Sequence, residues 1–309
     1  MRLDEVNEIA QLKTIMPQLR ALGVNRLVLE INYNFAFRKR PKLIGKYGPP
    51  MTPQEASELA TLASSLGIIL IPQFNCLGHQ SDGAKLFPLL TEFTDFREVA
   101  EPYCISPRSW CPTALGIWDI AYELIGDIAA AFGSKYVHVG MEEVLTMGQC
   151  HRCRDSNAAR LFALSVNELF NRLSADGIQM LMWGDRLLSK FETEYPANES
   201  SDNGTAPAID LISTDIIICD WHYSLPKAGS ASENYPSIDI FTKRNFRVWP
   251  CGWKDAVANT AFSSFARDFN SDKVIGYLAS TWAVEIPKLP KWEPLLKGIA
   301  AWTAPKQSA

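Results

Sequence analysis

Short apolar runs and longer amphipathic segments alternate along the whole chain. The short runs are rich in β-branched residues, and most are continuous, which is typical of parallel strands buried on both faces. They lie at residues 26–31, 67–74, 136–140, 179–183, 215–220, 246–249 and 274–279. Most of them start about 30 to 45 residues apart, the length of a strand, a helix and two connections.

Helix signals occupy the segments between these runs. Thr52-Pro53-Gln54-Glu55 has the N-cap, first-turn proline and N3 glutamate of a capping box. Further helices are predicted at 3–22, 117–132 and 158–173. The polar segment 198–205 is predicted to be a mobile surface loop.

The alternation predicts an α/β fold, a (β/α)8 barrel of the TIM type, as one domain over residues 1–309. A complete barrel has one more strand before the opening helix. Either that first strand is missing from this chain or the barrel is open there. The gap between residues 74 and 136 is long, and Cys104–Thr113 is expected to cross the face where the strands end.

Composition narrows the classes of function. Hydrophobic residues make up 47% and charged residues 21% of the 309 residues, as in ordinary globular proteins. The formal charge is -4, and the basic run Arg38–Arg40 is short, so nucleic acid is not an expected partner.

No apolar run approaches the roughly 18 residues of a membrane span. No secretory signal is visible, so we expect a cytoplasmic protein, or an extracellular or periplasmic one if the N-terminus is truncated. Oligomeric state stays open.

The cysteines favour free thiols. Their number is odd, at seven, although Cys104 and Cys111 are near enough in sequence to pair in an oxidising compartment. Cys150-His151-Arg152-Cys153 contains a Cys-x-x-Cys pair. A structural zinc site needs four ligands, and no second pair is spaced to complete the set. We therefore expect a loop staple or plain thiols here, and no metal.

Polar and aromatic residues gather where the predicted strands end, the place where α/β barrels hold their functional groups. They are Asn32, Tyr33, Asn75, Gly78, His79, Glu142, Glu143, Trp183, Asp185, Asp220, Trp221, His222, Tyr223, Trp249, Trp253, Trp282 and Glu285. Each has an ordinary structural explanation when taken alone. Together they suit a sugar, whose apolar face stacks on indole while its hydroxyls need polar partners.

The strand at 136–140 runs into two consecutive carboxylates, Glu142 and Glu143. Both can enter one pocket only where the strand ends and the backbone turns, and Gly140 would ease that turn. An ordinary retaining glycosidase needs two carboxyl groups about 5 to 5.5 Å apart on opposite sides of the scissile bond. Adjacent carboxylates suit a different mechanism, in which one is the general acid and the other orients a group of the substrate. The nucleophile then comes from the substrate itself. Two exposed glutamates at the start of a loop are the structural alternative.

These motifs resemble family 20 of the glycoside hydrolases, the β-N-acetylhexosaminidases. His138–Val144 is similar to the family's H-x-G-G-D-E-V strand, with Met141 in place of the second glycine and Glu142 in place of the aspartate. Ile71–His79, Met182–Asp185 and the pair Trp282 and Glu285 resemble three further family segments in the right order. The resemblance covers nearly the whole chain and looks closest to a bacterial branch with a Cys-x-x-Cys after the catalytic pair.

The resemblance implies a role for each matching residue. Glu143 would be the general acid and then the base, and Glu142 would hold the 2-acetamido group so that its carbonyl oxygen attacks C1. Trp183, Trp221 and Trp282 would line the sugar pocket, and Tyr223 could hydrogen-bond the attacking oxygen. The residues expected to contact hydroxyls or support the acid are Asp185, Glu285 and His79. The family's sugar-binding arginine lies on the first strand, so Arg38 or another rim residue would replace it.

The resulting hypothesis is an exo-glycoside hydrolase that removes terminal β-linked N-acetylhexosamine from a small-molecule or oligosaccharide substrate, without metal or organic cofactor. Because Glu142 is one methylene longer than the family's aspartate, a glycosidase of different sugar specificity is an alternative. A catalytically silent carbohydrate-binding barrel is another.

Overall fold

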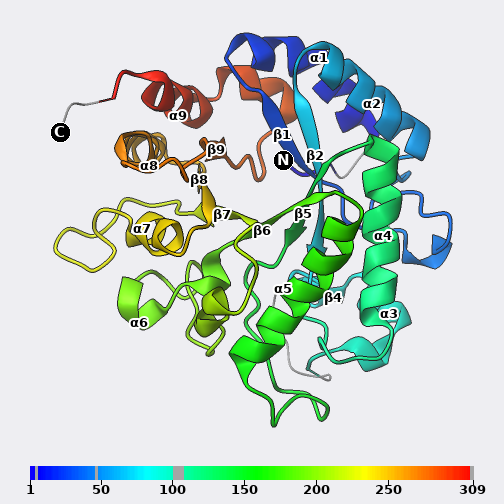
Figure 1. The fold of residues 1–309 in the computed structure, drawn as a ribbon. Coiled ribbons are helices and arrows are strands. Elements are labelled where there is room, and N and C mark those ends of the chain that lie inside the picture. Colours follow the sequence, from blue (N-terminus) through cyan, green and yellow to red (C-terminus); the bar gives the residue numbers. More distant parts are fainter. Residues whose placement is uncertain (4–5, 46–47, 100–107, 307–309) are drawn as a thin grey trace.

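A computed structural model describes residues 1–3, 6–45, 48–99 and 108–306 of the chain. Its centre is a parallel sheet of seven strands in the order β1-β2-β5-β6-β7-β8-β9 (Figure 1). These strands are β1 (Arg26–Glu30), β2 (Ile69–Cys76), β5 (Tyr136–Gly140), β6 (Gln179–Trp183), β7 (Ile217–Trp221), β8 (Arg247–Gly252) and β9 (Leu278–Ala279). The seven predicted strands are confirmed, although the last is much shorter than expected. A small antiparallel hairpin, β3 (Ser81–Asp82) and β4 (Lys85–Leu86), follows β2.

Helices cover the outside of the curled sheet, with α2, α4 and α5 on one side and α7, α8 and α9 on the other (Figure 1). The helices are α1 (Val6–Ala21), α2 (Pro53–Ser65), α3 (Pro88–Glu92), α4 (Ile117–Phe132), α5 (Ala158–Ala175), α6 (Lys190–Thr193), α7 (Pro236–Lys243), α8 (Ala256–Asp268) and α9 (Glu293–Thr303). The capping box of α2 is confirmed, because the Glu55 amide donates to Thr52 Oγ1 at 3.2 Å and the Thr52 amide donates to Glu55 Oε2 at 2.8 Å. Among the described residues, no helix combines the length and apolar character needed to cross a bilayer.

Two apolar layers hold the fold together. The larger lies between the sheet and the surrounding helices, where the inward faces of α4 and α5 are buried. The smaller lies inside the curl of the sheet and contains Trp183, Trp221 and Trp249. The continuous apolar runs of the sequence are explained by this arrangement, because each strand buries one face in each layer.

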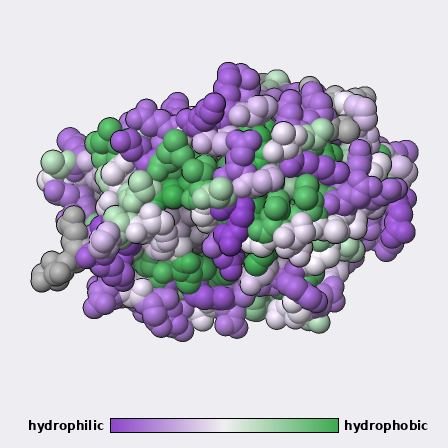
Figure 2. Space-filling view, turned by 90° about the horizontal axis from the view of Figure 1, so that it is seen from above, coloured by the Kyte–Doolittle hydropathy of each residue, from purple (hydrophilic) through white to green (hydrophobic). Residues whose placement is uncertain are grey.

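The sheet does not close between β1 and β9. Met1–Leu3 lie beside the carboxyl end of β1, where the Glu30 amide donates to Met1 O at 2.8 Å and the Leu3 amide donates to Glu30 O at 3.1 Å. A cavity of about 260 Å³ occupies the rest of the seam, and it is lined by residues of β1, β9 and α9. Hydrophobic surface shows between polar side chains when the molecule is viewed from the side that carries α1 and α9 (Figure 2).

The segment 198–205 differs from the expectation of a mobile loop. Ser200, Ser201 and Thr205 are buried in it. Asn203 Nδ2 donates to Val144 O at 2.8 Å, and Arg186 donates to the carbonyl oxygens of this segment. Its polar side chains therefore bind main-chain groups rather than water, and composition alone cannot distinguish the two cases.

Candidate active site

The backbone turns sharply where β5 ends. Gly140, Met141 and Glu143 have φ values of 73°, 76° and 48°, all in the left-handed region. Only glycine fits at the first of these positions, because a Cβ atom there would lie 2.8 Å from Asn75 Oδ1 and 2.9 Å from Glu142 Oε2. This turn gives the two neighbouring carboxylates directions that a regular strand would not allow.

The loop after β2 packs closely against this turn. A Cβ atom on Gly78 would lie 2.5 Å from Glu142 O, so glycine is needed for the approach. The contact places His79 Nε2 2.9 Å from Glu143 Oε2 and 4.0 Å from Glu142 Oε1. Two strand ends thus supply one cluster of a histidine and two carboxylates.

Burial and charge act in opposite directions on the protons of this cluster. Burial lowers the pKa of His79, but the Glu142 charge and the hydrogen bond to Glu143 outweigh it and raise that pKa to about 9. Burial raises the pKa of Glu142 to about 7, although the His79 cation works against this. A histidine and two carboxylates in contact are the kinds of group that general acid–base catalysis uses.

Glu142 keeps one hydrogen-bonding position open. Its Oε2 is buried and has no hydrogen-bond partner among the residues that the structure describes. A buried carboxylate oxygen without a donor carries a free-energy cost, so this atom would gain from an N–H or O–H donor, although Glu142 lines neither of the two cavities described below.

Asp185 anchors the Glu142-Glu143 turn through hydrogen bonds. Its Oδ2 accepts the Glu143 amide at 2.9 Å and Arg186 Nε at 2.7 Å, and its Oδ1 accepts Trp221 Nε1 at 3.3 Å. Burial raises the pKa of Asp185, and the Arg186 cation opposes this change. With its side chain buried and engaged, Asp185 links the acidic turn to the aromatic residues rather than facing the larger cavity.

The expected aromatic residues lie together inside the curl of the sheet. Trp183, Trp221, Tyr223 and Trp282 belong to one apolar cluster. The rings of Trp221 and Tyr223 are 4.8 Å apart, and Trp282 Nε1 donates to the Tyr223 hydroxyl at 3.0 Å. His138, the first residue of the signature motif, packs on Trp183 with 4.7 Å between ring centroids.

The expected site residues line two different cavities. Glu143 and His79 line a cavity of about 810 Å³ at the carboxyl ends of β1 and β2, together with Arg2 and Asn75. Trp183 and Trp282 line the smaller cavity in the open seam. The hydrogen bonds of Asp185 to both the Glu143 amide and Trp221 connect the two groups of residues.

Glu285, expected to contact a substrate hydroxyl or to support the acid, lines neither of the two cavities, and its role stays a prediction. Its side chain is 70% exposed and forms an ion pair with Lys288. Glu285 is the N-cap residue of a 3-10 helix, Ile286–Lys291, which turns its carboxylate toward the next turn of chain and into solvent.

His222 and Asp220, two further residues at the strand ends, are engaged in a buried ion pair. His222 Nδ1 lies 2.7 Å from Glu199 Oε2, and its Nε2 lies 3.1 Å from Asp220 Oδ1, in a buried ion pair. Burial lowers the pKa of His222, but these two carboxylates raise it to about 9. This group stabilises the barrel wall beside α7.

Arg2 is a site residue that sequence reasoning missed. It lines the larger cavity, and its Nε donates to Glu30 Oε1 at 2.7 Å. Asn32 Nδ2 donates to the same oxygen at 2.9 Å, which fixes the buried Glu30. Arg38, the candidate named from the sequence, is exposed and lies outside this cavity. An arginine that precedes the first recognisable helix gives no local signal of its position.

A parallel α/β barrel with an acid pair, a histidine and an arginine at the carboxyl ends of its strands has the architecture of a barrel enzyme. The sequence matches the family model described as "Glycosyl hydrolase family 20, catalytic domain" over residues 10–286. The chain belongs to this family. The resemblance read from the motifs is thereby confirmed.

Named relatives and solved structures agree with this membership. A beta-hexosaminidase of Vibrio furnissii is 23% identical over 210 residues, which are 67% of this chain and 31% of that protein. Beta-hexosaminidase A of Caenorhabditis briggsae is 25% identical over 155 residues, 46% of this chain and 27% of that protein. The chain thus spans about a third or less of the length of these relatives.

The fold is shared with solved members of the family. The β-N-acetylhexosaminidase of Bacteroides fragilis aligns with a TM-score of 0.71 at 12% identity, over 97% of this chain and 64% of that one. The exo β-N-acetylglucosaminidase of Vibrio harveyi, solved in complex with N-acetylglucosamine, aligns with a TM-score of 0.68 at 15% identity, over 95% of this chain and 51% of that one. The expected barrel architecture is confirmed, with the sheet open between β1 and β9.

Proposed function

We propose that the chain is the catalytic domain of an exo-acting β-N-acetylhexosaminidase that works by substrate-assisted catalysis with retention. The observation that carries this proposal is the turn after β5, which presents two neighbouring carboxylates beside His79 at the carboxyl ends of the strands. Family membership and the N-acetylglucosamine bound to the Vibrio harveyi relative support the choice of sugar.

Glu143 is the proposed general acid. It lines the larger cavity, and its Oε2 shares a hydrogen bond with His79 Nε2 at 2.9 Å. In the first step Glu143 gives its proton to the glycosidic oxygen as the bond to C1 breaks. In the second step it removes a proton from the attacking water. His79 holds Glu143 in place through this contact.

Glu142 is the proposed holder of the substrate's acetamido group. Its unpartnered Oε2 would accept the acetamide N–H, which directs the carbonyl oxygen of the substrate toward C1. The carbonyl oxygen forms a bond to C1 while the leaving group departs, giving a cyclic oxazolinium ion that Glu142 stabilises when it is ionised. Tyr223, whose hydroxyl lies 3.2 Å from Ser280 Oγ and accepts Trp282 Nε1 at 3.0 Å, would donate to that oxygen.

Exo action is supported by the size and the lining of the larger cavity. Its volume of about 810 Å³ lies within the range of small-ligand pockets, about 300 to 1,000 Å³. Residues of the β3–β4 hairpin belong to the lining and would limit the length of sugar chain that the cavity holds. Arg2, which lines the same cavity, would hold ring hydroxyls.

Glu143→Gln tests the assignment most directly. We expect the rate on an N-acetylglucosamine disaccharide to fall by about 10² to 10⁴, because a sugar leaving group needs its proton. An aryl N-acetyl-β-glucosaminide with an acidic phenol should lose less. Glu58→Gln, on the exposed face of α2, is the matched control and should keep the parent rate. Equal loss on both substrates would contradict a role of Glu143 as acid.

A glycosidase with another sugar preference is a second candidate, favoured by the extra methylene of Glu142 relative to the family's aspartate. A panel of aryl glycosides with and without the 2-acetamido group separates the two. Inhibition by a thiazoline analogue and faster turnover by Glu142→Asp would support the acetamide mechanism. Saturable sugar binding without turnover of any glycoside would instead indicate a silent barrel.

A further inference from the structure

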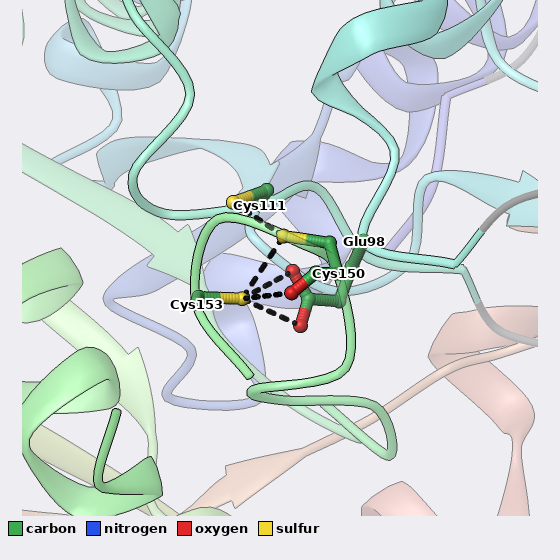
Figure 3. A group of neighbouring side chains, drawn as sticks. All are labelled: Glu98, Cys111, Cys150 and Cys153. Atoms are coloured by element: carbon green, nitrogen blue, oxygen red, sulfur yellow. Dashed lines mark hydrogen bonds between the residues drawn. The ribbon is translucent and has the colours of Figure 1, made fainter. Parts of the chain in front are cut away.

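A second cluster of reactive side chains lies outside the acidic site. The side chains of Glu98, Cys111 and the loop pair Cys150 and Cys153 come from three segments and point toward one another (Figure 3). One ligand atom from each lies within 4.8 Å of all the others. The exposed His151 between the two cysteines of the loop is not part of this cluster.

The distances suit a metal ion better than a disulfide. Cys150 Sγ lies 3.0 Å from Cys153 Sγ and 3.2 Å from Cys111 Sγ, and Cys153 Sγ lies 3.1 Å from Glu98 Oε1. A disulfide would need sulfurs about 2.05 Å apart. A zinc ion with Zn–S bonds of about 2.3 Å holds its sulfurs about 3.8 Å apart in a tetrahedron. A small outward movement of the side chains reaches that arrangement.

The cluster gathers acidic groups that are mostly buried, with only Cys150 partly exposed. Glu98, Cys111 and Cys153 are at most 1% exposed. Burial raises the pKa of the Cys153 and Cys150 thiols, and for Cys153 the neighbouring thiol and the Glu98 carboxylate add to the effect. Four acidic groups packed together in the interior become favourable when a cation binds between them.

Donors on the same loop surround the cluster. The Gln149 amide donates to Glu98 Oε1 at 2.7 Å. The Arg152 guanidinium donates to the carbonyl oxygen of Asp95, in the segment that precedes α4. Such outer contacts orient metal ligands and offset the negative charge that three thiolates and a carboxylate leave around a divalent ion.

We propose that Glu98, Cys111, Cys150 and Cys153 bind one structural zinc ion. Four protein ligands complete a tetrahedron and leave no open position, so the ion would hold structure rather than activate a water molecule. It would tie the loop that begins at the Glu142-Glu143 pair to the segment that precedes α4. The sequence argument against a metal stopped at Cys150 and Cys153, and the tertiary structure supplies the two further ligands.

Binding of zinc is a balanced proton exchange. Each thiol ligand gives up its proton to solvent as its sulfur bonds to the ion, and no oxidant or reductant takes part. Affinity should therefore fall as the solution is acidified. The proposal does not depend on the glycosidase activity, because its readout is metal content.

The full chain, purified without chelators, is analysed for metals by mass spectrometry, and the stripped, reduced chain is titrated with zinc alone. We expect about one zinc per chain and a higher Tm in the loaded form. Cobalt in place of zinc should give the cobalt–thiolate charge-transfer bands of a tetrahedral site. Failure of the reduced parent to take up zinc would overturn the proposal, as would bound iron with an iron–sulfur absorption spectrum.

Variants separate the site from general destabilisation. Cys153→Ser and Glu98→Gln should each weaken zinc binding by more than about tenfold. Glu98→Gln keeps the shape of the side chain and serves if the cysteine variant does not fold. Cys219→Ala removes an equally buried thiol from β7 and should bind zinc like the parent. Equal loss of zinc in all variants, or none in any, would overturn the assignment of these ligands.

Discussion

Replacing His79 by asparagine removes the cation that lies 2.9 Å from Glu143 and 4.0 Å from Glu142. Asparagine is the appropriate replacement because residue 79 has a φ of 53°, a conformation that asparagine tolerates better than most residues. The His79 charge lowers the pKa of Glu142, so its loss should raise that pKa above its present value of about 7.

The size of the effect follows from the 4.0 Å separation. Two unit charges at that distance interact by about 4 kcal/mol at an effective dielectric constant of about 20, and by about 1 kcal/mol in water. The side chains are 27% and 11% exposed, which places the pair between these limits. At about 1.4 kcal/mol for each pH unit, we expect the pKa of Glu142 to rise by about 1 to 2 pH units.

The pH dependence of kcat/KM on an aryl N-acetyl-β-glucosaminide measures this change, because it reports the free enzyme. Glu142 must be ionised to stabilise the oxazolinium ion, so the acidic limb of the profile should move to higher pH in the variant. His151→Asn, at an exposed histidine, is the control and should overlay the parent. An acidic limb in His79→Asn that stays in place, or that moves to lower pH, would refute the electrostatic coupling.

Two further predictions concern stability. Gly140→Ala should cost about 1 to 3 kcal/mol of unfolding free energy and lower activity, because its Cβ would meet Asn75 at 2.8 Å with φ at 73°. Gly126→Ala in α4, with open space around the new methyl group, should be neutral or stabilising in the same urea titrations. The pKa of His222, raised from 6.5 to about 9, adds stability that is complete below pH 6.5 and is lost as the pH rises through 9. The difference in unfolding free energy between parent and His222→Gln should therefore shrink by about 3 kcal/mol over that interval, and a constant difference would contradict the buried ion pair.

The order and type of the secondary structure elements were determined by local sequence. The run 136–140 and the helix 117–132 are observed with the predicted bounds, because apolar periodicity and capping act over a few neighbouring residues. The sequence also predicted acid chemistry for the Glu142-Glu143 pair, because both residues follow one strand. The ordered motifs identified the family without any knowledge of contacts.

Contacts between distant segments were decided only by the tertiary structure. His79 meets Glu143 across 64 residues, and Asp185 binds the Glu143 amide across 42. Such pairings depend on how the sheet curls and which loops pack together, and no window of sequence contains that information. The same reason explains why sequence analysis did not point to Arg2.

The cysteine cluster shows most clearly what local sequence determines and what only the tertiary structure determines. Sequence supplied the spacing of Cys150 and Cys153 and therefore half of a ligand set. Folding brings Cys111 to Cys150 across 39 residues and Glu98 to Cys153 across 55. A metal site is defined by the distances between its donor atoms, and those distances are set only when the barrel and its loops have packed.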